Sequence, residues 1–182
     1  VCSSDLDLLI GGIGDDTLEG GDGFDIASYE AAIAGVRVDL TKVGTVQNTR
    51  GDGLDKLSGI EGLKGSAFAD ALKGDSGDNA FEGGGGDDLI DGGAGVDTAI
   101  YAGASSAYSW SQNANGSWTV RGGEGVDILL NIESLKFTDK TITLSPSAAN
   151  VTIESLIPAG AVQILATGAY RDAVLSPNGQ TA

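Results

Sequence analysis

The chain has 182 residues and a net charge of −16, from 26 acidic and 10 basic side chains and no histidine. The scarcity of basic residues excludes a nucleic-acid binder that works by neutralising phosphates, and no apolar run approaches the ~20 residues of a membrane span. The absence of histidine excludes a Ser-His-Asp or Cys-His catalytic arrangement. Because a strongly acidic chain repels itself, we expect divalent cations to assist its compaction.

The first six residues, VCSSDL, do not share the pattern that follows them. They match one reading frame of a common sequencing adapter, so we interpret residues 1–6 as an artefact of assembly. Cys2 in this segment is the only cysteine of the chain, which excludes an internal disulfide.

Residues 7–28 hold the first block of a nonapeptide repeat with the pattern G-G-x-G-x-D-x-U-x, in which U is apolar. Gly11–Glu19 reads GGIGDDTLE, Gly20–Ser28 reads GGDGFDIAS, and Asp7–Ile10 is the end of an earlier copy. The first six residues of each copy are predicted to form a turn, because glycines allow positive φ and leave carbonyl groups uncovered. The last three are predicted to form a short strand with U facing inward.

Residues 29–64 combine an insert with a degenerate repeat, RGDGLDKLS, which keeps Asp55 and Leu57. Residues 65–101 form the main block, with four uninterrupted copies from Gly65 to Ile100, one of which has Asn79 in place of the aspartate. The side chains predicted to face inward are Leu9, Leu18 and Ala27 in the first block and Leu72, Phe81, Ile90 and Ala99 in the main block.

Residues 102–144 are predicted to be a β segment that caps the open end of the repeats. The segment contains a further copy, GGEGVDILL, preceded by a predicted hairpin, YSWSQNANGSWTVR. A two-residue loop would place Trp110 and Trp118 on opposite faces of this hairpin. A three-residue loop pairs Trp110 with Val120, places both tryptophans on one face and needs Gly116 in a left-handed conformation; we favour this register. The alternative interpretation of the two tryptophans is a sugar-binding platform.

Residues 145–182 contain no repeat. The apolar stretch ESLIPAGAVQILATGAY is open to two interpretations. It belongs either to an uncleaved C-terminal secretion signal or to the start of a further domain.

Stacking of the predicted turns would align carboxylates and bare carbonyl groups in a ladder. Ca²⁺ prefers six to eight hard oxygen ligands of this kind, whereas Mg²⁺ demands a stricter octahedral geometry. The acidic pairs Asp15-Asp16 and Asp87-Asp88 occupy positions five and six of the repeat, so a calcium turn explains them better than a pair of catalytic carboxylates.

The repeats resemble those of the RTX (repeats-in-toxin, hemolysin-type) calcium-binding family. This resemblance implies an all-β fold, a right-handed parallel β-roll in which two nonapeptides form one coil, turn n lies over turn n+2 and Ca²⁺ lies between them. Gly65–Lys73 should then stack with Gly83–Asp91, and Gly74–Glu82 with Gly92–Ile100. The antiparallel hairpin would flank this calcium-stacked solenoid as a cap.

The resemblance also implies a set of metal-binding residues. Side-chain ligands are expected at Asp7, Asp16, Asp25, Asp70, Asn79, Asp88 and Asp97, and turn backbone at Gly11, Gly12, Gly14, Gly20, Gly21, Gly23, Gly74, Gly77, Gly83, Gly84, Gly86, Gly92, Gly93 and Gly95. Asp25 is expected to lack a complete partner turn, because the copy that ends at Ile10 has lost its glycines.

Three further segments resemble parts of RTX proteins. Residues 29–49 are similar to an insert between coils, with GVRVDL as a strand. Residues 59–70, GIEGLKGSAFAD, resemble a linking rung, and residues 131–144, NIESLKFTDKTITL, resemble closing strands.

Folding of the repeats is expected to depend on several Ca²⁺ ions. One inward side chain per nine residues contributes roughly 1.5–3 kcal/mol when buried, which cannot offset roughly 1–2 kcal/mol of backbone entropy per ordered residue. Metal binding would supply the difference.

The resemblance implies a non-catalytic module of a secreted, extracellular bacterial protein. Such a module would leave the cell through type I secretion machinery, fold outside on binding calcium and stabilise or present a neighbouring domain. One alternative is the auxiliary C-terminal module of a secreted protease, lipase or polysaccharide-modifying enzyme. Another is the spacer of a surface adhesin.

Overall fold

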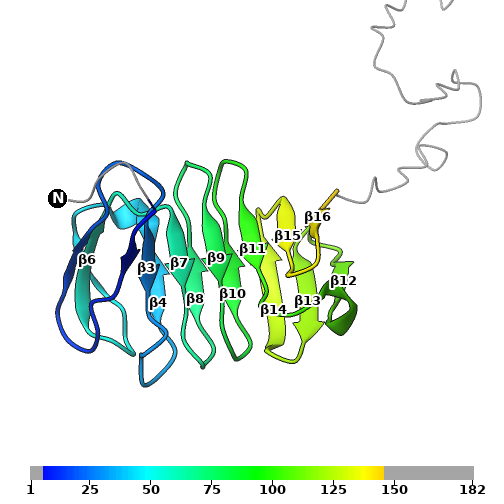
Figure 1. Ribbon diagram of the computed structural model, residues 1–182, viewed down its shortest axis with the longest axis horizontal. Helices are drawn as coiled ribbons and strands as arrows, with labels where there is room; N and C mark the ends of the chain where they lie inside the picture. Colours follow the sequence, from blue (N-terminus) through cyan, green and yellow to red (C-terminus); the bar gives the residue numbers. More distant parts are fainter. Residues whose placement is uncertain (1–5, 146–182) are drawn as a thin grey trace, which may run out of the picture. The chain divides into compact units, whose positions relative to one another are not determined.

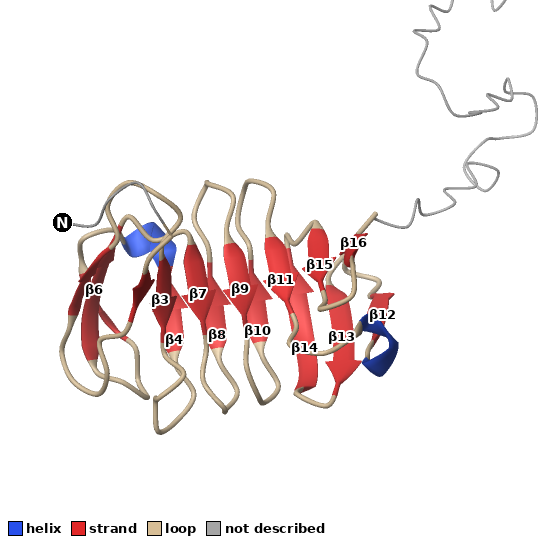
Figure 2. Ribbon diagram, in the orientation of Figure 1, coloured by secondary structure: helices blue, strands red, loops and turns tan. Residues whose placement is uncertain are grey.

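The computed structural model describes residues 6–145, and this part of the chain is all-β, as predicted (Figures 1 and 2). The strands are β1 (Leu8–Leu9), β2 (Thr17–Glu19), β3 (Ile26–Ser28), β4 (Arg37–Asp39), β5 (Val46–Asn48), β6 (Leu54–Ser58), β7 (Gly62–Lys64), β8 (Ala71–Lys73), β9 (Ala80–Glu82), β10 (Leu89–Asp91), β11 (Thr98–Ile100), β12 (Ser109–Gln112), β13 (Trp118–Gly122), β14 (Gly125–Leu130), β15 (Ser134–Lys136) and β16 (Thr141–Thr143). Two 3-10 helices, η1 (Leu40–Lys42) and η2 (Ser105–Ala107), lie in the segments between repeats.

Most strands belong to two sheets that face each other (Figure 2). One sheet has the order β1-β3-β7-β9-β11-β15-β16 and the other has the order β12-β13-β14-β10-β8-β4, while β2-β6-β5 form a third, smaller sheet. Successive strands of the main block alternate between the two large sheets, so that two nonapeptides complete one coil.

The coils of the main block stack in parallel with the predicted register. Leu89 of β10 pairs with Ala71 of β8, and Thr98 of β11 pairs with Ala80 of β9. Antiparallel strands join the parallel coils at β5, β12, β13 and β16, so the sheets are mixed. The prediction that turn n lies over turn n+2 is confirmed for the main block.

The central residue of each repeat strand fills the space between the sheets. Leu72, Phe81, Ile90 and Ala99 are at most 1% exposed, and Leu18 and Ala27 are buried in the first block. Leu9 is partly buried against the same core. By contrast, Phe24 and Leu89, at variable positions of the repeat, remain exposed. The sequence pattern therefore predicted the inward-facing side chains correctly.

A duplication underlies the arrangement of strands. Residues 7–64, the first copy, align without a gap with residues 79–136, the second copy, 72 positions further along, and 21 of these 58 positions carry the same residue. Strands β2, β3, β6 and β7 of the first copy correspond to β10, β11, β14 and β15 of the second. The predicted insert and the predicted cap are therefore two versions of one structural unit.

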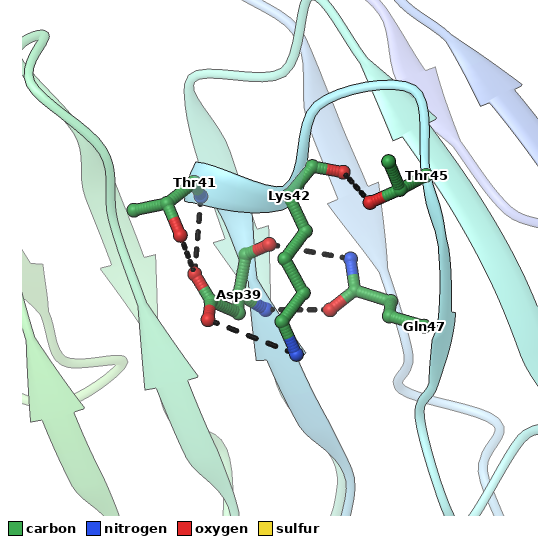
Figure 3. Close-up of polar contacts among 5 residues, drawn as sticks. All are labelled: Asp39, Thr41, Lys42, Thr45 and Gln47. Atoms are coloured by element: carbon green, nitrogen blue, oxygen red, sulfur yellow. Dashed lines mark hydrogen bonds and ion pairs between the residues drawn. The ribbon is translucent and has the colours of Figure 1, made fainter.

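In the first copy, a side chain joins β5 to β4 (Figure 3). The buried Gln47 accepts a hydrogen bond from the Asp39 N–H at its Oε1 (2.8 Å) and donates one from its Nε2 to the Asp39 carbonyl (3.3 Å). Asp39 also accepts hydrogen bonds from the Thr41 N–H and hydroxyl at the start of η1. The Gln47 amide thus joins the smallest sheet to the six-stranded sheet beside an isolated backbone bridge between Val36 and Arg50.

In the second copy, the corresponding β12 and β13 pair through their backbones. Trp110 lies opposite Val120, Gly116 has a φ of +88°, and the Asn113 N–H donates to the Ser117 carbonyl, which leaves a three-residue loop. The predicted hairpin register is confirmed. Trp110 and Trp118 pack against the core, and the Trp110 ring lies 5.5 Å from that of Phe137, as expected of a cap.

Candidate metal centre

A ladder of carboxylates runs along the seven-stranded sheet, at the residue that precedes each strand. In each case an earlier coil donates a backbone N–H to a carboxylate of a later coil: Asp7 to Asp25 Oδ1 (3.1 Å), Asp25 to Glu61 Oε2 (2.9 Å), Asn79 to Asp97 Oδ1 (2.7 Å) and Asp97 to Glu133 Oε2 (2.8 Å). The turns that contain these residues are therefore stacked on one another, as the calcium hypothesis requires.

A second ladder of the same kind serves the strands on the opposite side. The N–H donors and carboxylate acceptors are Asp16 to Asp55 Oδ1 (3.0 Å), Val36 to Asp70 Oδ1 (2.7 Å), Asp70 to Asp88 Oδ1 (2.9 Å) and Asp88 to Asp127 Oδ1 (3.1 Å). One oxygen of each of these carboxylates accepts a hydrogen bond from a neighbouring coil. Whether the carboxylate needs a further partner therefore depends on its other oxygen.

Three of the predicted aspartates have a buried second oxygen with no hydrogen-bond partner: Asp25, Asp88 and Asp97, each at Oδ2. These residues are at most 2% exposed. A buried carboxylate without a compensating charge is costly, and burial raises the pKa of Asp88 to about 7 and that of Asp97 to about 6. Orphaned carboxylate oxygens in stacked turns fit a hard divalent cation such as Ca²⁺.

Protein cations do not fill this role within residues 6–145. The ion pairs of this part of the chain join Lys42 to Asp39 and Lys64 to Glu30 and Glu82. None of them reaches the orphaned oxygens. No three Asp, Glu, Cys or His side chains of the described residues converge as a metal cluster, so backbone carbonyls of the glycine-rich turns would have to complete the coordination of an ion.

Two of the predicted ligands are already satisfied by the protein. Asp70 accepts hydrogen bonds at both oxygens, from the Val36 N–H and from the N–H and hydroxyl of Ser66. Asn79 accepts from the Asp75 N–H and donates to the Glu61 carbonyl at 3.3 Å. These are the positions at which the sequence departs from the repeat pattern, and the structure provides no orphaned oxygen there.

Asp25 has hydrogen-bond partners on both sides, while the prediction that it lacks a complete partner turn falls largely on residues outside the described part of the chain. On the side of residue 7 it accepts the Asp7 N–H, and on the other side its own N–H donates to Glu61. The partner there is a short turn, Gly59-Ile60-Glu61, in which Gly59 has a φ of +58° and Ile60 is buried. The second copy repeats this turn as Asn131-Ile132-Glu133.

Sequence reasoning missed four members of the two ladders: Asp55, Glu61, Asp127 and Glu133. They stack at spacings of 36 and 39 residues rather than 18, because an insert separates them from their partner turns. The signal that identifies them is the duplication, since Asp55 and Asp127, and likewise Glu61 and Glu133, occupy equivalent positions in the two copies.

Comparison with known families agrees with this geometry. The model of the RTX calcium-binding nonapeptide repeat matches residues 3–27 and 64–99, in four copies. These segments are therefore RTX repeats, which indicate calcium binding and are typical of secreted bacterial proteins. A search of curated proteins gave no match. Among the described residues, no helix is long and apolar enough to cross a membrane.

Proposed function

We propose that this chain is a non-catalytic module that folds as a right-handed parallel β-roll when several Ca²⁺ ions bind to its stacked turns. The observation that carries this proposal is the set of buried, unpartnered Oδ2 atoms on Asp25, Asp88 and Asp97. Bound Ca²⁺ would supply the positive charge that these carboxylates lack. With turn carbonyls as the remaining ligands, the ions would hold successive coils together.

Calcium control of folding gives the module a use outside the cell. With 26 acidic and 10 basic side chains, the metal-free chain repels itself and stays open. We propose that it passes through type I secretion machinery in that state, folds at extracellular Ca²⁺ concentrations and stabilises a neighbouring domain. Sites with a Kd of about 10⁻⁴–10⁻³ M would suffice for this role. The localisation rests on the known occurrence of RTX repeats in secreted bacterial proteins.

A calcium titration followed by far-UV circular dichroism tests the proposal. The metal-free chain should lack most of its strand signal and gain it on addition of Ca²⁺, while Mg²⁺ at the same concentrations serves as the control. The Asp97→Asn variant should need a higher Ca²⁺ concentration, because it removes an orphaned carboxylate. A strand signal that persists unchanged in chelator would contradict the proposal.

A further inference from the structure

Asp52 is a buried carboxylate outside the matched repeats. It occupies the third position of the degenerate turn RGDGLD, at residues 50–55. Of the equivalent residues in intact turns, Ile13, Asp22 and Ala94 are exposed and Gly85 and Glu124 are half-buried. Asp52 is 5% exposed and its Oδ1 has no hydrogen-bond partner. The first copy therefore buries a charged side chain at a turn position that is more exposed in the other repeats.

The turn that contains Asp52 is stacked on the turn of residues 11–16. The Gly14 N–H donates to the Asp52 carbonyl (2.7 Å), the Leu54 N–H to Asp15 Oδ1 (3.0 Å) and the Asp16 N–H to Asp55 Oδ1 (3.0 Å). Burial and the nearby negative charges of Asp55 and Asp16 raise the pKa of Asp52. The charges of Asp55 and Asp16 are thus near enough to act on Asp52, although the three carboxylates do not converge as a metal cluster. None of the ion pairs within the described residues reaches Asp52.

The second copy shows how the same junction is neutralised without an ion. Its equivalent of Asp52 is Glu124, whose Oε2 accepts the Tyr108 hydroxyl (2.8 Å), and its Asp127 Oδ2 accepts the Tyr101 hydroxyl (3.0 Å). The first copy has Val36 where the second has Tyr108. Asp52 has therefore lost the hydroxyl donor that its counterpart uses.

We propose that the first copy binds a Ca²⁺ ion between the turn of residues 11–16 and the turn of residues 50–55, with Asp52 Oδ1 as a ligand. Backbone carbonyls of the two turns would supply the remaining ligands, because Asp55 already accepts hydrogen bonds from the Asp16 N–H and the Thr49 hydroxyl. The site rests on the calcium binding proposed above and adds a ligand beyond residues 3–27 and 64–99, the matched repeats.

Isothermal titration calorimetry with Ca²⁺ on the full chain, combined with metal analysis after gel filtration in Ca²⁺, tests this site. Asp52→Asn should bind one Ca²⁺ fewer per chain, or bind one ion at least tenfold more weakly. Glu124→Gln removes the equivalent charge from a hydrogen-bonded position and should keep the full number of ions. Asp22→Asn is the control for loss of an exposed charge.

The Asp97→Asn variant separates this inference from the function as a whole. If Asp97→Asn loses calcium while Asp52→Asn binds as the unaltered chain does, the Asp52 site is wrong and the calcium-binding function stands. If the unaltered chain binds no Ca²⁺, both are wrong.

Tb³⁺ luminescence gives a second measurement that leaves every carboxylate in place. Tyr29 is 2% exposed, and burial, followed by the charges of Asp55 and Asp52, raises its pKa. We therefore expect Tyr29 to sensitise an ion held by Asp52. Tyr29→Phe should lower the tyrosine-sensitised Tb³⁺ emission, and excess Ca²⁺ should abolish the difference from the unaltered chain. Equal emission from both proteins would overturn the site.

Discussion

Residues 7–64 and 79–136 follow the same course through the sheets, yet their interiors differ at equivalent positions. The second copy has Tyr108, Trp110 and Trp118 where the first has Val36, Val38 and Val46. Around Phe137 the second copy assembles an aromatic cluster, with ring centroids 5.2 Å from Tyr108 and 5.5 Å from both Tyr101 and Trp110. The first copy buries Gln47, Thr49 and Asp52, whereas the equivalent residues of the second copy are a buried Thr119, an exposed Arg121 and a half-buried Glu124.

The same backbone course is thus stabilised by different interactions in the two copies. Aromatic packing contributes in any solvent and needs no ligand. A buried carboxylate is favourable only when a cation or a donor satisfies it, and each copy holds two such groups without a partner, Asp25 and Asp52 in the first and Asp88 and Asp97 in the second. The difference between the copies therefore rests on the aromatic cluster. We therefore expect the second copy to be the less calcium-dependent half of the molecule.

The largest expected effect is a difference between the copies during calcium titration. Amide hydrogen exchange, followed by mass spectrometry at increasing Ca²⁺, should show protection of residues 79–144 at lower Ca²⁺ than that of residues 7–64. Protection of strands such as β11 and β15 should precede that of β2 and β6. Simultaneous protection of both copies, or protection of the first copy before the second, would contradict the comparison.

Removal of the central ring of the aromatic cluster should destabilise the second copy strongly. Phe137→Ala deletes a side chain that is 5% exposed and contacts three other rings. It should lower the free energy of unfolding by about 3–5 kcal/mol, measured by denaturant titration in saturating Ca²⁺. Phe68→Ala, at a residue that is 46% exposed, is the matched control and should change stability little. Equal losses in the two variants would show that the cluster has no special role.

A smaller effect is expected from one substitution at equivalent glycines. Gly12 and Gly84 have φ values of +86° and +93°, so alanine is strained at both. A Cβ on Gly12 meets no atom within 4 Å, whereas one on Gly84 would lie 2.0 Å from the Ser66 carbonyl oxygen of the stacked coil. Gly84→Ala should therefore cost about 1–3 kcal/mol more than Gly12→Ala in the free energy of unfolding. Identical midpoints in thermal unfolding would mean that the turns are not packed as tightly as described.

Much of the fold could be predicted from the nine-residue period. The period places one apolar residue of each strand inward and assigns the first six residues to a turn, and the buried Phe81 and Ile90 follow from it directly. The hairpin register could also be predicted, since only a three-residue loop puts Trp110 and Trp118 on one face.

The remaining parts of the site depend on contacts that no local pattern encodes. Glu61 joins the carboxylate ladder from a three-residue turn, which is shorter than the turn of the repeat. The longer side chain of glutamate compensates for the shorter turn. Gln47 joins two sheets through its side-chain amide, which has no signature in the sequence. Asp52 is buried although the residues at the same position of other turns are more exposed, and no local pattern signals this. An alignment of the chain with itself indicates Glu61, because Glu133 occupies the equivalent position in the second copy.

The hydrogen bonds of the two ladders all point the same way along the chain. In every rung the backbone N–H belongs to the earlier coil and the accepting carboxylate to the later one, as in Asp70 with Asp88 and Asp97 with Glu133. The carboxylates one position before them run the opposite way, since Asp15, Asp78 and Asp87 accept N–H groups of a later coil. In a solenoid, where each coil contacts only its neighbours, these opposed hydrogen bonds fasten a junction from both of the coils that meet there.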